Sequence, residues 1–182
     1  MKKLIVLLIV LLIVLIIALA LLATVSGCGG NKSGLEAPSS LPEKTTMVRL
    51  YYSTGTELAV EDRVVEDSND TIKATLNLLL NAQPQNSAIS KVVQPKCKVL
   101  DAKLNNNGLL TVNFSKEILD FKAGDSEETL AYAALIETIK QFTNVKSVKF
   151  LVEGKDKGQV NGKDIQAFWG SISLINQPRP IQ

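Results

Sequence analysis

A long apolar run near the start of the chain limits which residues can take part in the fold. Lys2 and Lys3 are followed by 20 consecutive apolar residues, 4–23, and small residues then lead to Cys28. A basic start, an apolar run and a small-residue cleavage site are typical of a secretory signal peptide, which is absent from the mature protein. We therefore expect residues 1–27 to be a signal peptide and look for the fold beyond them.

The residues at the expected cleavage point, Val25-Ser26-Gly27-Cys28, resemble the lipobox of bacterial lipoproteins. This resemblance implies that Cys28 carries a diacylglyceryl group and, after cleavage, begins the mature chain. Two acyl chains hold a protein stably on a membrane where one does not. The alternative is an uncleaved anchor, because 20 apolar residues at about 1.5 Å each can span a bilayer core of about 30 Å. Both alternatives leave the lysines in the cytoplasm and place residues 29–182 on the extracytoplasmic face of the membrane.

The charge pattern and the residue types exclude several classes of function. The chain has 20 basic and 18 acidic side chains, and residues 1–27 hold two of the basic ones, so the mature part is formally neutral. Because no basic cluster stands out, we expect no nucleic-acid partner. There is no histidine, which removes Ser-His-Asp and Cys-His catalysis and the commonest zinc ligand. We therefore predict a protein that is not an enzyme and has no catalytic residues, metal or cofactor.

The acidic residues form three clusters that could hold a pair of catalytic carboxylates. We interpret them instead as charges that protect an edge strand or favour a helix start. The clusters are Glu61-Asp62, Glu66-Asp67-Asp70 and Asp125-Glu127-Glu128.

Hydrophobic periodicity predicts two helices and five strands. Asn105-Asn106-Asn107-Gly108 joins two of the strands, and Asn-Gly tolerates positive φ at both turn positions. We expect Ser68 or Asn69 to cap the first helix, and Asp125 and Glu128 to form a capping box on the second. The expected strands are 47–52, 60–66 (an edge strand, because it is charged), 98–104, 110–114 and 145–152, and the expected helices are 70–82 and 126–142.

This order of elements predicts an α+β fold, a small and mostly antiparallel sheet with two helices on one face. Gly, Ser and Pro dominate residues 28–45, which we expect to be a flexible tether. The folded domain is expected at 46–175, and the tail 176–182 is expected to fray.

Three side chains have two interpretations each. If Cys28 is lipidated, Cys97 has no cysteine partner within the chain, and it is either a core residue or a reactive or intermolecular thiol. Phe168 and Trp169 are adjacent large aromatic residues beyond the last long strand. They either close over the core or contact a partner protein, since Trp is enriched at interface hot spots.

The folded region resembles the GerM domain family of sporulation and spore germination proteins. The resemblance lies in the order and spacing of several segments more than in any single motif. These segments are residues 48–52, 58–65, 74–80 followed by Pro84, 108–115, 139–148 and 152–154.

The resemblance implies a non-enzymatic domain with a fold like that of the ring-building modules of sporulation channels. We therefore expect a lipid-anchored assembly or scaffold protein whose partners are envelope or sporulation-channel proteins and possibly peptidoglycan. The alternative is a lipoprotein that binds a cell-wall fragment or a small ligand, and an envelope hydrolase is a third hypothesis that the missing histidines disfavour.

Overall fold

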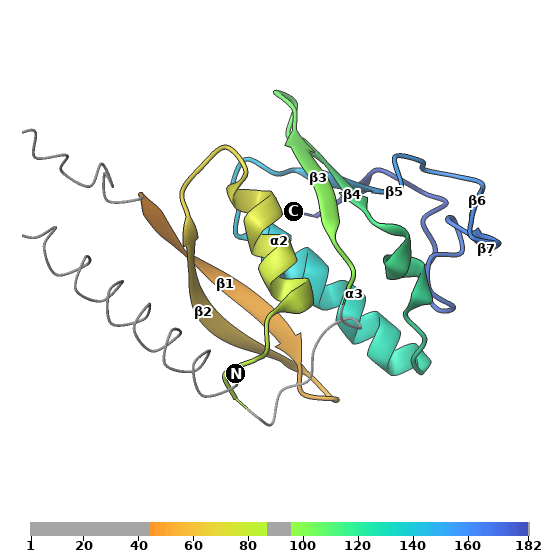
Figure 1. The fold of residues 1–182 in the computed structure, drawn as a ribbon, viewed down its shortest axis with the longest axis horizontal. Coiled ribbons are helices and arrows are strands. Elements are labelled where there is room, and N and C mark those ends of the chain that lie inside the picture. Colours follow the sequence, from red (N-terminus) through yellow and green to blue (C-terminus); the bar gives the residue numbers. More distant parts are fainter. Residues whose placement is uncertain (1–43, 87–95, 182) are drawn as a thin grey trace, which may run out of the picture. The chain divides into compact units, whose positions relative to one another are not determined.

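The computed structural model describes residues 44–86 and 96–181, all within one compact unit, Leu41–Gln182. The signal peptide expected at 1–27 and nearly all of the tether expected at 28–45 lie outside the described residues. Within the described ranges, no helix is both long and apolar enough to cross a membrane. The described residues form an α+β fold, with two α-helices and small, mostly antiparallel sheets, which confirms the predicted class (Figure 1).

The first two strands form a hairpin that is separate from the other strands. β1 (Thr45–Ser53) and β2 (Leu58–Glu66) pair antiparallel over nine residues without a register shift. Val48, Leu50 and Tyr52 alternate along β1 and are buried, so one face of the hairpin belongs to the core. Among the described strands β2 pairs with β1 alone, which confirms that it is an edge strand.

The other long strands form a four-stranded sheet. Its order is β3 (Val99–Leu104), β4 (Leu109–Phe114), β5 (Ser147–Val152) and β8 (Arg179–Pro180). The β4–β5 pair is parallel and the other two pairs are antiparallel. Two further short strands, β6 (Gln159–Val160) and β7 (Lys163–Asp164), form a small hairpin. The strands are therefore divided among separate sheets, where the periodicity alone had suggested one.

The C-terminal segment is ordered, and the prediction that residues 176–182 fray is wrong for its described part. Arg179 and Pro180 pair with β5, and the Ile181 side chain is buried. The physical reason is that β5 has a free edge beyond β4, and an apolar residue next to that edge gains by leaving water.

The turn between β3 and β4 uses a different geometry from the one expected. Of the two residues Asn107 and Gly108, only Gly108 has positive φ, at 83°. Asn105 Oδ1 accepts hydrogen bonds from the backbone N–H groups of Asn107 and Leu109, both at 3.0 Å. A Cβ atom on Gly108 would lie 2.8 Å from Lys146 Cγ. Glycine is therefore required here by its φ angle and by the close approach of the chain that enters β5.

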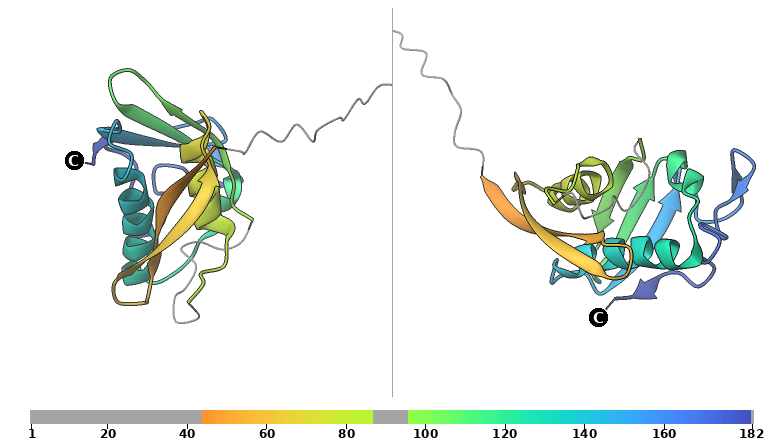
Figure 2. Two further views of the ribbon diagram at one scale, coloured as in Figure 1. Left: turned by 90° about the vertical axis from the view of Figure 1, so that its left-hand side faces the viewer. Right: turned by 90° about the horizontal axis from the view of Figure 1, so that it is seen from below.

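The two α-helices fill the space between the sheets. α2 (Thr71–Asn81) lies between the β1–β2 hairpin and β3, and α3 (Asp125–Lys140) runs alongside β1 (Figures 1 and 2). A short 3₁₀ helix, Lys116–Asp120, follows β4. Both α-helices lie within two residues of their expected bounds, because their apolar residues recur at helical spacing.

The predicted caps of both helices are wrong. Asp70 is the residue before α2, and no side chain caps that end of the helix. α3 begins after Gly124, whose N–H donates to Glu127 Oε2 at 3.3 Å. Glu128 turns inward instead of capping, because it is a buried acceptor for another segment of the chain, as described below.

Candidate functional site

Two cysteines, Cys28 and Cys97, are among the residues singled out from the sequence. Cys28 lies outside the described residues, so its lipidation stays a prediction. Cys97 is fully buried and unpaired, which agrees with the core interpretation. Burial raises the pKa of the Cys97 thiol to about 12. A buried thiol with such a pKa is protonated at neutral pH and is a poor nucleophile.

Phe168 and Trp169 close over the core, which is the first of their two interpretations. Their exposed fractions are 5% and 2%, and the two rings stack with centroids 4.7 Å apart. Trp169 Nε1 donates to the Ile118 carbonyl at 2.8 Å, so the indole N–H is satisfied inside the protein. Phe121 and Phe150 continue the aromatic cluster on either side. Little of either side chain is left for a partner to contact.

Two residues of the acidic clusters, Glu128 and Glu61, have structural roles. Glu128 accepts hydrogen bonds from Ser171 N–H at 2.7 Å and from Ser171 Oγ at 2.8 Å. The Ser171 backbone bond lowers the pKa of Glu128. This contact ties the start of α3 to the segment after Trp169. Among the described residues, no group of three His, Cys, Asp or Glu side chains is arranged to hold a metal ion.

Glu61 is a second buried carboxylate, on the inner face of β2. It accepts from the backbone N–H groups of Gln85 and Asn86 at 2.9 and 3.0 Å, and Arg63 Nη2 lies 2.6 Å from its other oxygen. Burial raises the pKa of Glu61, but the N–H groups of Gln85 and Asn86 and the guanidinium of Arg63 together bring it below its usual value. Glu61 and Arg63 thereby hold residues 83–86 over the inner face of β2.

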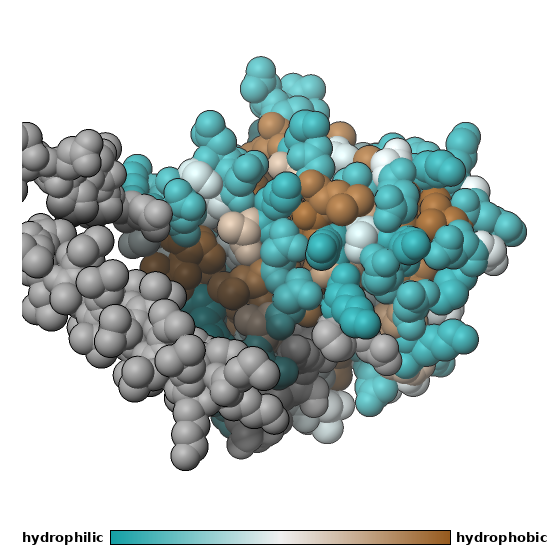
Figure 3. Space-filling view, viewed as in Figure 1, coloured by the Kyte–Doolittle hydropathy of each residue, from teal (hydrophilic) through white to brown (hydrophobic). Residues whose placement is uncertain are grey.

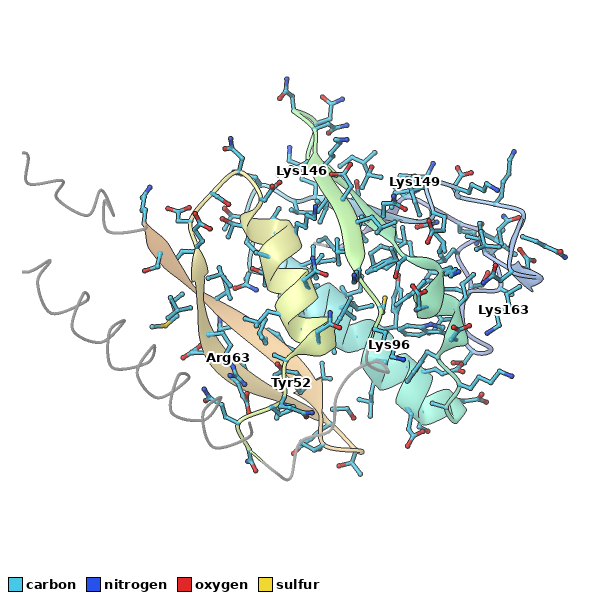
Figure 4. The ribbon with its side chains drawn as sticks, viewed as in Figure 1. Tyr52, Arg63, Lys96, Lys146, Lys149 and Lys163 are labelled. Carbon is cyan, nitrogen blue, oxygen red and sulfur yellow. The ribbon has the colours of Figure 1, made fainter. Side chains whose placement is uncertain are left out.

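Tyr52 of β1 and Arg63 of β2 lie near each other, as Figure 4 shows. Among the described residues, neither the buried Tyr52 hydroxyl nor Arg63 Nε has a hydrogen-bond partner. Burial raises the pKa of Tyr52, so the hydroxyl is neutral at ordinary pH.

Side-chain amides cover the outer edges of three strands. Gln141, just past α3, accepts from Arg49 N–H at 2.8 Å and donates to the Arg49 carbonyl at 2.8 Å. Asn77 of α2 accepts from Val99 N–H at 2.9 Å and donates to the Val99 carbonyl at 3.2 Å. In both pairs the carboxamide takes the place of a neighbouring strand's peptide group.

The third covered edge is that of β5, beyond its short pairing with β8. Gln177 Oε1 accepts from Phe150 N–H at 2.5 Å, and Gln177 Nε2 donates to the Phe150 carbonyl at 3.1 Å. We refer to the outer edges of β1, β3 and β5, where Arg49, Val99 and Phe150 are bonded in this way, as the covered edges.

The outer edge of β2 differs from these. Arg49 and Tyr51 direct their N–H groups away from β2, toward Gln141 and Thr138. In an antiparallel pair, two opposite residues direct their backbone N–H and C=O groups either both toward each other or both away from each other. The register pairs Tyr51 with Val60, Arg49 with Asp62 and Met47 with Val64. The backbone N–H and C=O groups of Val60, Asp62 and Val64 therefore point outward, and we call them the open edge.

No described residue makes a hydrogen bond to the backbone of the open edge. Val60 and Val64 are 53% and 63% exposed, and Met47 beside them is 69% exposed. Figure 3 shows apolar side chains on the side of the molecule where β1 and β2 lie. The open edge therefore combines free backbone groups with an exposed apolar surface, and both features are typical of sites where another chain pairs.

A groove of about 560 Å³ runs beside the end of the open edge. Val64, Val65 and Glu66 line one side of it, and Ala74, Leu78 and Ala82 of α2 are among the residues on the other. Its lining is mostly apolar, so a side chain entering it from a docked strand would leave water.

Sequence reasoning identified β2 as a charged edge strand but missed the covered edges. One signal was present for Asn77, a polar amide between Leu76 and Leu78 in an otherwise apolar run of helix. No local pattern distinguishes Gln141 or Gln177 from a solvent-exposed glutamine, because their partners lie 92 and 27 residues away in the chain.

Comparison with known proteins gives one family and one fold. The family model Germane, described as sporulation and spore germination, matches residues 49–158. The solved structure of the tandem GerMN domains of the sporulation protein GerM from Bacillus subtilis is 20% identical, with a TM-score of 0.54 over 67% of this chain. This chain covers only 45% of that tandem-domain protein.

The first GerMN domain of the same protein, solved separately, is also 20% identical. Its TM-score is 0.53, and the match covers 66% of this chain and 93% of that domain. At 20% sequence identity, these structural matches show a shared fold alone. Comparison with curated protein sequences found no match.

Proposed function

Because this chain belongs to the Germane family of sporulation and spore germination proteins, we propose that it is a non-enzymatic assembly module of the cell envelope, held at the membrane through Cys28. The observation that carries the proposal is a family domain at residues 49–158 that follows a lipobox-like sequence. A scaffold needs a rigid domain and a surface for its partner. The packed aromatic core supports the first requirement and the open edge the second.

The anchoring half of the proposal is tested with the Cys28→Ala variant in the native host. Labelling with a radioactive fatty acid should be lost, because sulfur is the acceptor of the diacylglyceryl group. Cys97→Ala is the matched control, since it removes the other thiol and should leave the labelling unchanged. Labelling of Cys28→Ala at the wild-type level would contradict the lipid anchor.

The sporulation half is tested by fractionating cells through growth and starvation and detecting the protein by immunoblot. We expect it in the membrane fraction of sporulating cells, where cross-linking should capture other envelope proteins. Constant abundance in growing cells, with no difference in spore yield after deletion, would contradict a sporulation role and favour general cell-wall binding.

A further inference from the structure

We propose that the open edge of β2 binds an extended basic segment of a partner protein, which adds a strand to the β1–β2 hairpin. This inference deepens the proposed function, on which it rests, by stating how an assembly partner is held. The first support is the backbone geometry. Val60, Asp62 and Val64 offer N–H and C=O groups at strand spacing, and no described residue occupies them. An added strand would satisfy these groups, as in other cases of strand addition.

The lack of a proline and of a bulge is the second support. Natural edge strands are protected by proline, by bulges, by inward-pointing charges or by a covering segment. β2 contains no proline and has no register shift in nine pairs with β1. Its inward-pointing charges, Glu61 and Arg63, are paired with each other. In this molecule three other strand edges are covered by amide side chains. The fold therefore covers edges elsewhere, whereas none of the residues that the structure describes covers this one.

The charge of the open edge selects the partner. The exposed row of β2 consists of Val60, Asp62, Val64 and Glu66, in which both charged residues are acids. Arg49 lies opposite Asp62 on β1, but that places it about 10 Å from an added strand, two strand spacings away. Arg63 is engaged by Glu61 on the other face. Lysine or arginine side chains on the added strand would therefore face carboxylates directly, and acidic ones would be repelled.

The groove beside α2 indicates which side chains suit the other face of the added strand. Side chains of a strand alternate between its faces, so residues between the basic ones would point to the groove lined by Val65, Ala74 and Leu78. The expected partner segment thus alternates basic and apolar residues. The same charges disfavour a second copy of this chain, because two β2 edges paired about Asp62 would bring like charges together.

The test uses the full-length chain in nanodiscs of zwitterionic lipid and two labelled peptides of about seven residues, which matches the exposed row of β2 from Val60 to Glu66. One peptide alternates valine with lysine and the other alternates valine with glutamate. Binding is measured by fluorescence anisotropy, and hydrogen exchange locates the protected amides. We expect the lysine peptide to bind at least about tenfold more tightly than the glutamate peptide, and the protection to fall in β2.

Two variants localise the interaction. Val64→Pro removes one outward N–H and should weaken binding of the lysine peptide about tenfold, whereas Val64→Ala keeps the N–H and should bind within about threefold of wild type. If Val64→Pro unfolds, Asp62→Asn combined with Glu66→Gln provides the second test, with an expected loss of about fivefold that high salt reproduces in wild type.

Equal binding of both peptides, or protection outside β2, would overturn the proposal. Self-association of the wild-type chain that Val64→Pro abolishes would overturn it in favour of a second copy. Because these measurements need neither lipidation nor sporulating cells, they can fail while the proposed function stands, and the reverse is equally possible.

Discussion

The two outer edges of the β1–β2 hairpin belong to strands that pair over nine residues each, yet the edges have opposite surroundings. On the β1 side, Thr138 and Gln141 of the α3 region bond to the backbone of Tyr51 and Arg49. On the β2 side, no described residue bonds to the outward groups. Backbone groups on an exposed edge can bond to water, so leaving them free costs little stability but creates a template for pairing. The difference indicates that one edge serves the fold and the other remains available for a partner.

The largest expected effect comes from proline substitutions at adjacent positions of β2. The N–H of Val65 points to β1, whereas that of Val64 points outward. Val65→Pro should therefore destabilise the protein by about 3 kcal/mol or more, because it removes a ladder bond and disturbs a buried position. Val64→Pro should cost about 1 kcal/mol, since edge strands accept proline where the N–H faces solvent. Urea unfolding followed by circular dichroism measures both, and equal losses would refute the assignment of the open edge.

A second prediction concerns the covered edge of β3. Asn77→Leu keeps a side chain of similar size but leaves both backbone groups of Val99 without their partner. Val99 is almost fully buried, so we expect a loss of about 2–3 kcal/mol in the free energy of unfolding. Asn69→Leu, at a described position before α2, is a control for introducing leucine. A change of less than half a kcal/mol in the first variant would show that the amide is dispensable.

How much of this contrast the sequence could predict depends on the distance between interacting residues. The strands and helices were predictable because Leu110, Val112 and Phe114 alternate and Leu76, Leu79 and Leu80 share a helical face. The edge position of β2 was predictable from its charges. The amide contacts, the pairing of β8 with β5 and the contact of Glu128 with Ser171 were not, because each joins residues far apart in the chain. The predicted cap of α3 failed for the same reason, since Glu128 bonds to the distant Ser171. At α2 the reason is local, because the Ser68 hydroxyl accepts from the N–H of Asp70, the residue before the helix, instead of from a group within it.

The third prediction concerns the buried carboxylate Glu61 on the inner face of β2. Glu61 holds residues 83–86 over the inner face of β2, and its folded pKa lies below the usual value. The stability from its ionised form is therefore full above the unfolded pKa of about 4.3 and is lost as the pH falls through the folded pKa. Glu61→Gln should destabilise the protein by about 2 kcal/mol at pH 7.

Urea midpoints of wild type and Glu61→Gln, taken from pH 7 down to pH 3, check the sign of this dependence. The difference between the two proteins should shrink as the pH falls below the unfolded pKa of about 4.3, and it should vanish once the pH has passed the lower folded pKa of the wild-type carboxyl. Glu57→Gln, in the exposed turn of the same hairpin, should leave the midpoint unchanged at every pH. A difference that grows toward low pH would contradict the role given to the Glu61 carboxylate.

The smallest effect is expected at the covered edge of β1, where it tests whether one freed pair of backbone groups is enough for pairing. Gln141→Ala frees the N–H and C=O groups of Arg49, which lie near solvent, so the loss should be only about 1 kcal/mol. The rest of the β1 edge stays covered, because Thr138 still bonds to Tyr51 and α3 still lies alongside the strand. This variant should therefore bind the valine–lysine and valine–glutamate peptides as wild type does. Tighter binding of either peptide would mean that a single freed pair of backbone groups accepts a strand, and that the acids of β2 do not decide where a peptide pairs.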